Sequence, residues 1–195
     1  MLASITPLGE RGRHRRYAVT TAAFLLGGVA AGAALGAVLG ALGALLLSGL
    51  ATSVRLVALA LGLALALAID LRPGPAPGPR RQVDERWLDE LRGWVYGLGY
   101  GAQLGLGVST VVSSAATYVA LLAALLCAGA GAGAVILGLY GLVRGLTPLL
   151  AAGVRSPDQL VRFHARFIGV QRLVAMAGRI ALGAVTAVTV IAVLG

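Results

Sequence analysis

The chain has 195 residues, of which 58% are hydrophobic and 12% charged, and its mean hydropathy is +0.91. A soluble domain has typically about 25% charged residues, so this composition excludes an ordinary globular surface and indicates a membrane protein. The formal net charge of +9 comes from arginines beside the apolar segments, with no lysine anywhere. That placement favours orientation in a bilayer over nucleic-acid binding.

Apolar segments predict an all-α fold with about five membrane-spanning helices. Their expected bounds are 17–47, 54–69, 98–126, 134–153 and 173–194. The first and third segments exceed the roughly 20 residues that cross a bilayer. Each is therefore expected to tilt, to break at glycine or to extend beyond the bilayer.

Arginine placement predicts the orientation. The arginine-rich stretches 11–16, 71–92 and 155–172 fall on one side if five helices cross, which puts the N-terminus in the cytoplasm and the C-terminus outside. The expected parts are a cytoplasmic segment 1–16, a transmembrane hairpin 17–71, a linker with an interfacial helix 72–97, a second hairpin 98–153, a basic cytoplasmic loop 154–172 and a last transmembrane helix 173–195. Arginine without lysine, in a chain rich in alanine and glycine, indicates a GC-rich bacterial genome. We therefore expect a multi-pass protein of a bacterial inner membrane.

The linker between the second and third spans has two parts. "PGPAPGP", 73–79, cannot continue a helix because each proline lacks an amide donor and restricts its predecessor. The next stretch, 81–100, predicts an amphipathic helix at the membrane surface, with Trp87, Leu88, Leu91 and Trp94 on one face. Its acidic residues are interpreted as a solvated face, with partner docking as the alternative.

Two ladders place glycine at every fourth residue, from 28 to 40 and from 93 to 105. In lipid, small residues at this spacing let helix backbones approach closely, so both ladders predict helix packing. The candidate packing residues are Gly28, Gly32, Gly36, Gly40, Gly97, Gly101 and Gly105. The spacing leaves open whether they join helices within one chain, in a homo-oligomer or to a membrane partner subunit.

Polar residues gather in the third expected span, "GAQLGLGVSTVVSSAATY". The candidate solute-binding residues here are Gln103, Ser109, Thr110, Ser113 and Thr117. Ser109, Ser113 and Thr117 recur at spacing four and could supply hydroxyl oxygens to an ion or polar solute. Serine and threonine in such helices also bond preceding carbonyls or tie helices together, which is the structural alternative.

Arg144 lies near the centre of the fourth expected span, in "GLYGLVRGLTPLLAAG". A charge at that depth costs several kcal/mol unless it is paired or wetted, so Arg144 is a functional candidate. Pro148 frees the carbonyl of Arg144 and predicts a kink near Thr147, which we include in the candidate site. Asp70 is the nearest acidic candidate partner. The alternative is that Arg144 snorkels to the headgroups.

No soluble-type catalytic motif is present, so no enzymatic activity, cofactor or metal is expected. The single cysteine, Cys127, permits no disulfide within the chain, and neither His14 nor His164 has a partner at ligand spacing. A thiol redox relay between two protomers through Cys127 is the least favoured function.

The glycine-rich stretches "FLLGGVAAGAALGAVLGALG" and "GYGAQLGLGVSTVVSSAATYVALLAALL", with "GAGAVILGLYGLVRGLTPLLAAG", resemble a known membrane superfamily. It comprises the thiol–disulfide interchange and cytochrome c biogenesis membrane domains and the sulfite-exporter-like proteins. Gly141, Gly145 and Pro148 fall where that family has a turn. Its redox cysteines would fall around 108–114, where this chain has none, and its first cysteine-bearing helix is absent. Thiol exchange needs two cysteines, so the chain alone should not perform it.

Two functions remain as expectations. The first is a transport-type membrane protein that binds or moves a small solute, with an anion as the leading candidate. Its path would lie between the third and fourth spans, beside Arg144. The second is a non-catalytic subunit or scaffold that assembles with partner helices through the glycine ladders.

Overall fold

The computed structural model describes residues 5–72, 74, 76–78, 86–107, 112 and 114–194, and this part of the chain contains helices and no strand. In chain order the helices are α1 (Pro7–Gly12), α2 (Tyr17–Leu47), α3 (Thr52–Leu71), α4 (Trp87–Glu90), α5 (Gly93–Gly105), α6 (Ala116–Leu126), α7 (Ala130–Gly145), the 3₁₀ helix η1 (Thr147–Ala151) and α8 (Pro157–Leu194). Four stretches of the described chain are long and apolar enough to cross a membrane: Tyr17–Leu47, Thr52–Leu71, Ala130–Ala151 and Pro157–Val193.

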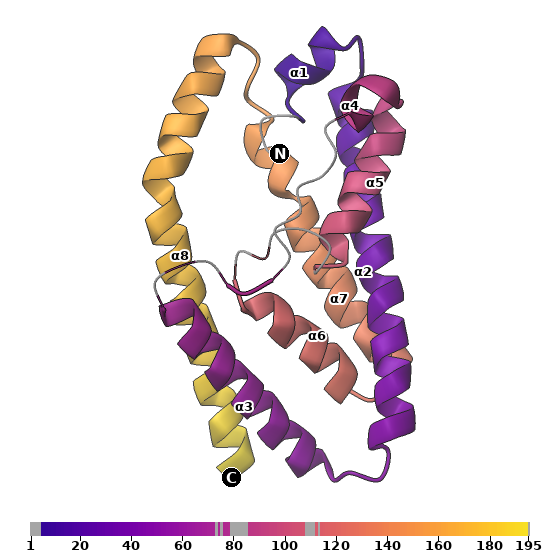
Figure 1. Cartoon of the computed structure of the whole chain (residues 1–195), viewed down its shortest axis with the longest axis vertical. Helices are drawn as coiled ribbons and strands as arrows, with labels where there is room; N and C mark the ends of the chain where they lie inside the picture. The colour runs from indigo at the N-terminus through magenta and orange to yellow at the C-terminus, as the bar shows by residue number, and fades with distance from the viewer. Residues whose placement is uncertain are drawn as a thin grey trace.

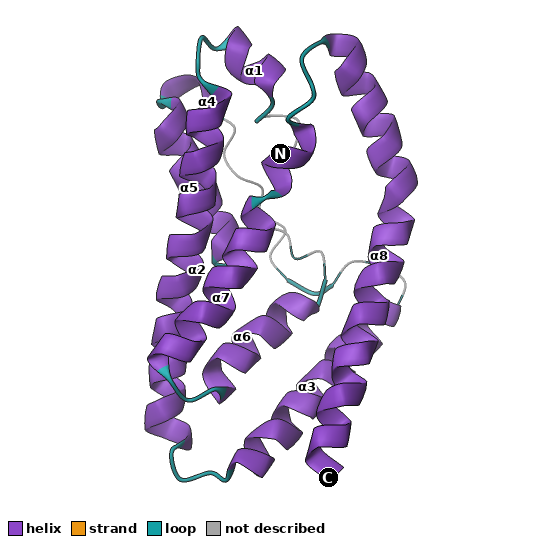
Figure 2. Cartoon of the chain, turned by 180° about the vertical axis from the view of Figure 1, so that it is seen from behind, coloured by secondary structure: helices purple, strands orange, loops and turns teal. Residues whose placement is uncertain are grey.

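Helix α2 runs along nearly the whole length of the molecule, and α5 and α7 pack along it (Figure 1). Helices α1 and α4 lie at one end, which we call the α1 end. Helix α3 leans away from α2 and packs against α8, while α6 lies between this pair and α2 (Figure 2). The molecule therefore has two parts, a bundle centred on α2 and the α3–α8 pair.

Glycines bring the backbones of the α2-centred bundle together. A Cβ atom built on Gly101 of α5 would lie 1.9 Å from the carbonyl oxygen of Phe24 in α2. One built on Gly36 of α2 would lie 2.0 Å from the carbonyl oxygen of Gly133 in α7. Gly28, Gly32, Gly36 and Gly40 all lie against the backbone of α7 or the residue before it, and Gly97, Gly101 and Gly105 lie against α2. These seven contacts are all within one chain.

The third expected span, 98–126, is not one helix. Helix α5 ends at Gly105 and α6 begins at Ala116, so the expected helix is interrupted between these two residues. Gly107 has a φ of +75°, in the left-handed region that glycine adopts readily. Of the three outcomes expected for this long segment, the structure has the break at glycine.

Two further expectations differ from the structure. The amphipathic helix expected over 81–100 is divided: α4 covers only Trp87–Glu90, α5 starts at Gly93, and 81–85 lie outside the described residues. The chain is extended at Leu91 and Arg92, which frees the buried Leu88 and the half-buried Trp87 to pack with Tyr96 and Tyr100. Trp94, expected on the same face, is exposed.

The basic loop expected over 154–172 is helical for most of its length. Helix α8 begins at Pro157 and continues without interruption to Leu194, so the last helix does not begin at 173. Hydropathy marks only the residue at which a helix becomes apolar. The polar residues before 173 contain nothing that ends a helix, so α8 includes them. The arginines of 157–172 therefore lie on a helix and not in a loop.

Candidate functional site

The interruption between α5 and α6 lies beside the polar end of α7. A Cβ atom on Gly107 would lie 3.0 Å from Cγ2 of Thr117 and 3.3 Å from the ring of Tyr140. Glycine at this position therefore serves two needs, the positive φ and the close approach of two side chains from α6 and α7. The helix break and the first turn of α6 thus meet α7 at one place.

A chain of hydrogen bonds starts at Arg144 and leads to this break. The Nη1 atom of Arg144 donates to the hydroxyl of Tyr140 at 2.5 Å, and that hydroxyl lies 2.9 Å from Oγ1 of Thr117. The guanidinium carbon lies 5.5 Å from the centroid of the Tyr140 ring, within cation–π range. Because Tyr140 is one turn earlier on α7, the half-buried Arg144 side chain points away from the α1 end, towards the interruption.

Arg144 is the second-to-last residue of α7, and along the apolar segment Ala130–Ala151 it lies closer to the middle than to either end. Helix α7 ends at Gly145, and η1 follows with the buried Pro148 in its first turn. The hydroxyl of Thr147 donates to the carbonyl oxygen of Arg144, a backbone group next to the break. The hydroxyl of Tyr17 donates to the carbonyl oxygen of Pro148 at 2.7 Å, which ties this turn to α2.

The other sequence-predicted residues fall in two groups. Gln103 is half-buried on α5 and Thr117 is buried on α6. Ser109, Thr110 and Ser113 lie outside the described residues. The structure therefore brings Arg144 and Thr117 together, through Tyr140, which the sequence analysis did not select. The spacing of Tyr140 and Arg144, four residues apart on one helix, was the available signal.

Asp70 does not pair with Arg144. Its Oδ1 atom accepts the amide hydrogen of Ala115 at 2.8 Å, and its Oδ2 atom accepts the hydroxyl of Ser114 at 2.5 Å. Both donors lie at the start of α6, where the first amides of a helix lack partners within the helix. Asp70 therefore caps α6 and joins it to the end of α3.

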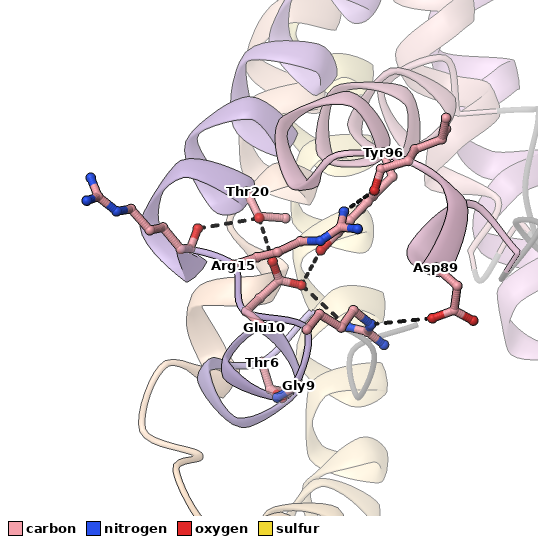
Figure 3. Close-up of polar contacts among 10 residues, drawn as sticks. Thr6, Gly9, Glu10, Arg15, Thr20, Asp89 and Tyr96 are labelled. Atoms are coloured by element: carbon pink, nitrogen blue, oxygen red, sulfur yellow. Dashed lines mark hydrogen bonds and ion pairs between the residues drawn. The ribbon is translucent and has the colours of Figure 1, made fainter.

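A buried carboxylate near the α1 end was missed by the sequence analysis. Glu10 is 0% exposed, and its Oε2 atom accepts the hydroxyl of Thr20 at 2.6 Å, while Oε1 accepts the hydroxyl of Tyr96 (Figure 3). The Nη1 atom of Arg13 lies 3.5 Å from Oε1. We call Glu10, Arg13, Thr20 and Tyr96 the Glu10 cluster. It joins α1 to α2 and α5.

The chain around the Glu10 cluster adds two further contacts. Arg15 donates to the carbonyl oxygen of Leu91, and its guanidinium carbon lies 5.4 Å from the centroid of the Tyr96 ring. Burial, and the hydrogen bond to the Glu10 carboxylate, raise the pKa of Tyr96 to about 12. The phenol therefore stays protonated to a higher pH than an ordinary tyrosine, and its O–H donates a hydrogen bond to Oε1 of Glu10.

A local signal for α1 was present in the sequence. Thr6 is the N-cap, with its Oγ1 accepting the amide hydrogen of Gly9 at 3.0 Å, and Pro7 follows in the first turn. Threonine at the N-cap and proline directly after it are typical helix starts. The burial of Glu10, by contrast, depends on Tyr96, 86 positions away.

The class of protein follows from the helices. Four apolar segments long enough to cross a bilayer are compatible with a multi-pass membrane protein. Comparisons with protein-family models, with curated proteins and with solved structures find no match for the chain. The functional argument therefore depends on the geometry around Arg144, Asp70 and Glu10.

Proposed function

We propose that the chain is a transport-type membrane protein that binds a small anionic solute beside Arg144. The observation that supports this most directly is the hydrogen-bond chain from Arg144 through Tyr140 to Thr117, which ends at the interruption between α5 and α6. A guanidinium in an apolar helix is costly and calls for a wet or ligand-lined surrounding. Its planar set of donors suits carboxylate and oxyanion ligands.

A discontinuous helix supports the same proposal. Transporters bind solutes where helices are interrupted, because backbone groups freed from the helix become available as ligands. In this chain the end of α5 supplies freed carbonyls, and the hydroxyl of Thr117 adds a polar group. Ser109, Thr110 and Ser113 fall in the sequence between α5 and α6, Gln103 belongs to α5, and Thr147 begins η1 beside Arg144. We propose that these residues complete the path.

The experiment that tests this proposal is flux of a panel of carboxylates and inorganic oxyanions in proteoliposomes. Arg144→Gln should abolish flux of the transported anion, while Arg144→Lys should keep part of it because the charge remains. Arg155→Gln removes an equal charge from an exposed position and should leave flux unchanged. Size-exclusion profiles in detergent must match wild type for each variant. Unchanged flux in Arg144→Gln would end the assignment.

The finer topology is part of the proposal. We propose five crossings in a bacterial inner membrane, with residues 98–126 of α5 and α6 as one crossing, the N-terminus in the cytoplasm and the C-terminus outside. The arginine-rich stretches on one side support it. In a Cys127→Ser background, a cysteine at Ser48 should react with an impermeant thiol reagent from outside, and one at Arg155 only after permeabilisation. The reverse pattern would invert the topology.

A scaffold or subunit role is the second candidate. It is favoured by α8, whose large apolar side chains are mostly exposed and could contact a partner helix or a second copy. The glycine ladders give it less support, since their contacts are with helices of the same chain. Purification from native membranes with a partner at fixed stoichiometry would favour the scaffold, and a chain that purifies alone would oppose it.

A further inference from the structure

A cavity of about 410 Å³ lies between α8, the end of α3 and the start of α6. Two opposite charges line it, Asp70 from α3 and Arg179 from α8. The polar side chains of Ser114 and Gln171 lie on the same walls, and the rest is mainly apolar, including Phe167. Its volume falls in the range of sites that bind small molecules, about 300–1,000 Å³.

The two charges differ in what they already bind. No described residue forms an ion pair or a hydrogen bond with Arg179, which lines the cavity. Each oxygen of Asp70 accepts one hydrogen bond from the start of α6. A carboxylate has about four acceptor sites in all, so Asp70 can accept further donors. The cavity therefore offers a cation and an anion to the same ligand.

The surroundings of the cavity are apolar and exposed. On α8, Val174 is 65% exposed and Ile180 is 70% exposed, and on α3 Leu71 is 62% exposed. Exposed apolar faces of this kind contact acyl chains when a helix lies in a bilayer. A ligand that suits both the charges and these faces has a zwitterionic head and hydrocarbon tails.

We propose that this cavity binds the headgroup of a zwitterionic phospholipid that carries a primary ammonium. The phosphate pairs with Arg179 and the ammonium with Asp70, while the acyl chains lie along the exposed faces of α8 and α3. A charge-assisted hydrogen bond from the ammonium to Asp70 is what distinguishes this headgroup from a quaternary one. The lipid site is separate from the anion site beside Arg144, so either can be absent without the other.

The test is lipid binding by the purified, delipidated full-length protein, followed by native mass spectrometry. Phosphatidylethanolamine, phosphatidylcholine and phosphatidylglycerol with identical acyl chains are titrated in parallel. Phosphatidylethanolamine should bind roughly tenfold more tightly than the other two, the effect of one charge-assisted hydrogen bond. Equal binding of the three, or tighter binding of phosphatidylglycerol, would overturn the proposal. Glycerophosphoethanolamine, which lacks acyl chains, must bind more weakly than the lipid, since equal binding would assign the site to a free solute.

Matched variants separate the two charges. Arg179→Gln should lower binding of both phosphatidylethanolamine and phosphatidylcholine, whereas Arg179→Lys should retain most of it. Asp70→Asn, which still accepts the amide hydrogen of Ala115, should remove the preference for phosphatidylethanolamine and leave phosphatidylcholine binding unchanged. Arg172→Gln removes an exposed arginine from the same helix outside the cavity. If Arg172→Gln causes the same loss as Arg179→Gln, general surface charge explains the binding and the proposal is wrong.

Discussion

The α2-centred bundle and the α3–α8 pair are both built from apolar helices that contain glycine, but they use glycine differently. In the bundle, added Cβ atoms at Gly32, Gly101 and Gly105 would lie 1.9–2.3 Å from carbonyl oxygens of neighbouring helices. On α8, an added Cβ at Gly169 or Gly178 would meet nothing within 4 Å. The same residue type therefore brings two backbones into contact in the bundle and occupies open space at these two positions of α8.

This difference concerns what holds membrane helices together. Lipid is as apolar as leucine, so burial of apolar side chains gives little drive for association, and close packing of backbones contributes more. The bundle has that packing along much of α2, whereas α8 meets α3 through side chains such as Leu63 and Leu182. We therefore expect the bundle to be the more stable part and α8 to separate first.

The largest expected effect is at Gly101. Gly101→Ala forces the backbones of α5 and α2 apart and should lower the free energy of unfolding by about 3 kcal/mol or more, at the upper end for overpacked sites. Gly169→Ala on α8 is the control, and should be neutral or stabilising by about 0.5–1 kcal/mol. Unfolding in mixed micelles with increasing SDS measures both. Equal stability of the two variants would remove the distinction between the two parts.

The next largest decrease in stability is expected for a substitution in the Glu10 cluster. Glu10→Ala removes the acceptor of the Tyr96 hydroxyl and the nearer of the two acceptors of the Thr20 hydroxyl, and should cost about 2–4 kcal/mol. Since α1 would then detach, trypsin should cut the arginines of 11–16 faster than in wild type. Glu90→Ala, an exposed carboxylate on α4, should stay within about 0.5 kcal/mol of wild type. Unaltered proteolysis of Glu10→Ala would show that the cluster does not hold α1.

A smaller decrease in the free energy of unfolding is expected for a substitution in the α3–α8 pair. Leu182 is 8% exposed and packs in the cluster of Leu63 and Ala66. Leu182→Ala should cost about 1–2 kcal/mol, less than the 2–5 kcal/mol typical of soluble cores, because lipid can fill the space. Unfolding in the same mixed micelles measures it. A larger decrease than that of Gly101→Ala would contradict the expectation that the α2-centred bundle is more stable than the α3–α8 pair.

The smallest effect at neutral pH concerns the Tyr96 phenol. Its pKa in the folded protein, about 12, lies above its ordinary value of 10.0, so its contribution to stability is present below pH 10 and is lost as pH rises through 12. The difference in tyrosinate absorbance between wild type and Tyr96→Phe should therefore titrate near pH 12. A midpoint near pH 10 would mean that the Tyr96 phenol is neither buried nor hydrogen-bonded to Glu10 in the folded protein.

Part of the fold could be predicted because it depends on local patterns. The bounds of α2, Tyr17–Leu47, equal those expected from hydropathy, and the break beside Gly107 was one of three expected outcomes for the third segment. The predicted start of the last helix was wrong, because the apolar pattern begins at 173 whereas α8 begins at Pro157. Hydropathy reports the surrounding medium, whereas helix ends are marked by capping residues and by glycine or proline.

The candidate site contains two residues that the sequence predicted, Arg144 and Thr117, and one that it did not, Tyr140. Arg144 stood out because an arginine in an apolar segment is rare, which is a property of the sequence alone. Tyr140 was not selected, because its role depends on the direction of the Arg144 side chain and on the approach of Thr117 from α6. Asp70 was considered as a partner for Arg144, but the start of α6 lies closer to it.

By itself, the amino-acid sequence determined the apolar helices, which are compatible with a multi-pass membrane protein, because hydropathy and helix propensity act over neighbouring residues. Only the tertiary structure decided that both glycine ladders meet helices of the same chain, that Glu10 is buried and that Arg179 shares a cavity with Asp70. Each of these depends on residues distant in the chain. Their meeting is set by which backbones can approach, and spacing along one helix cannot specify the helix opposite.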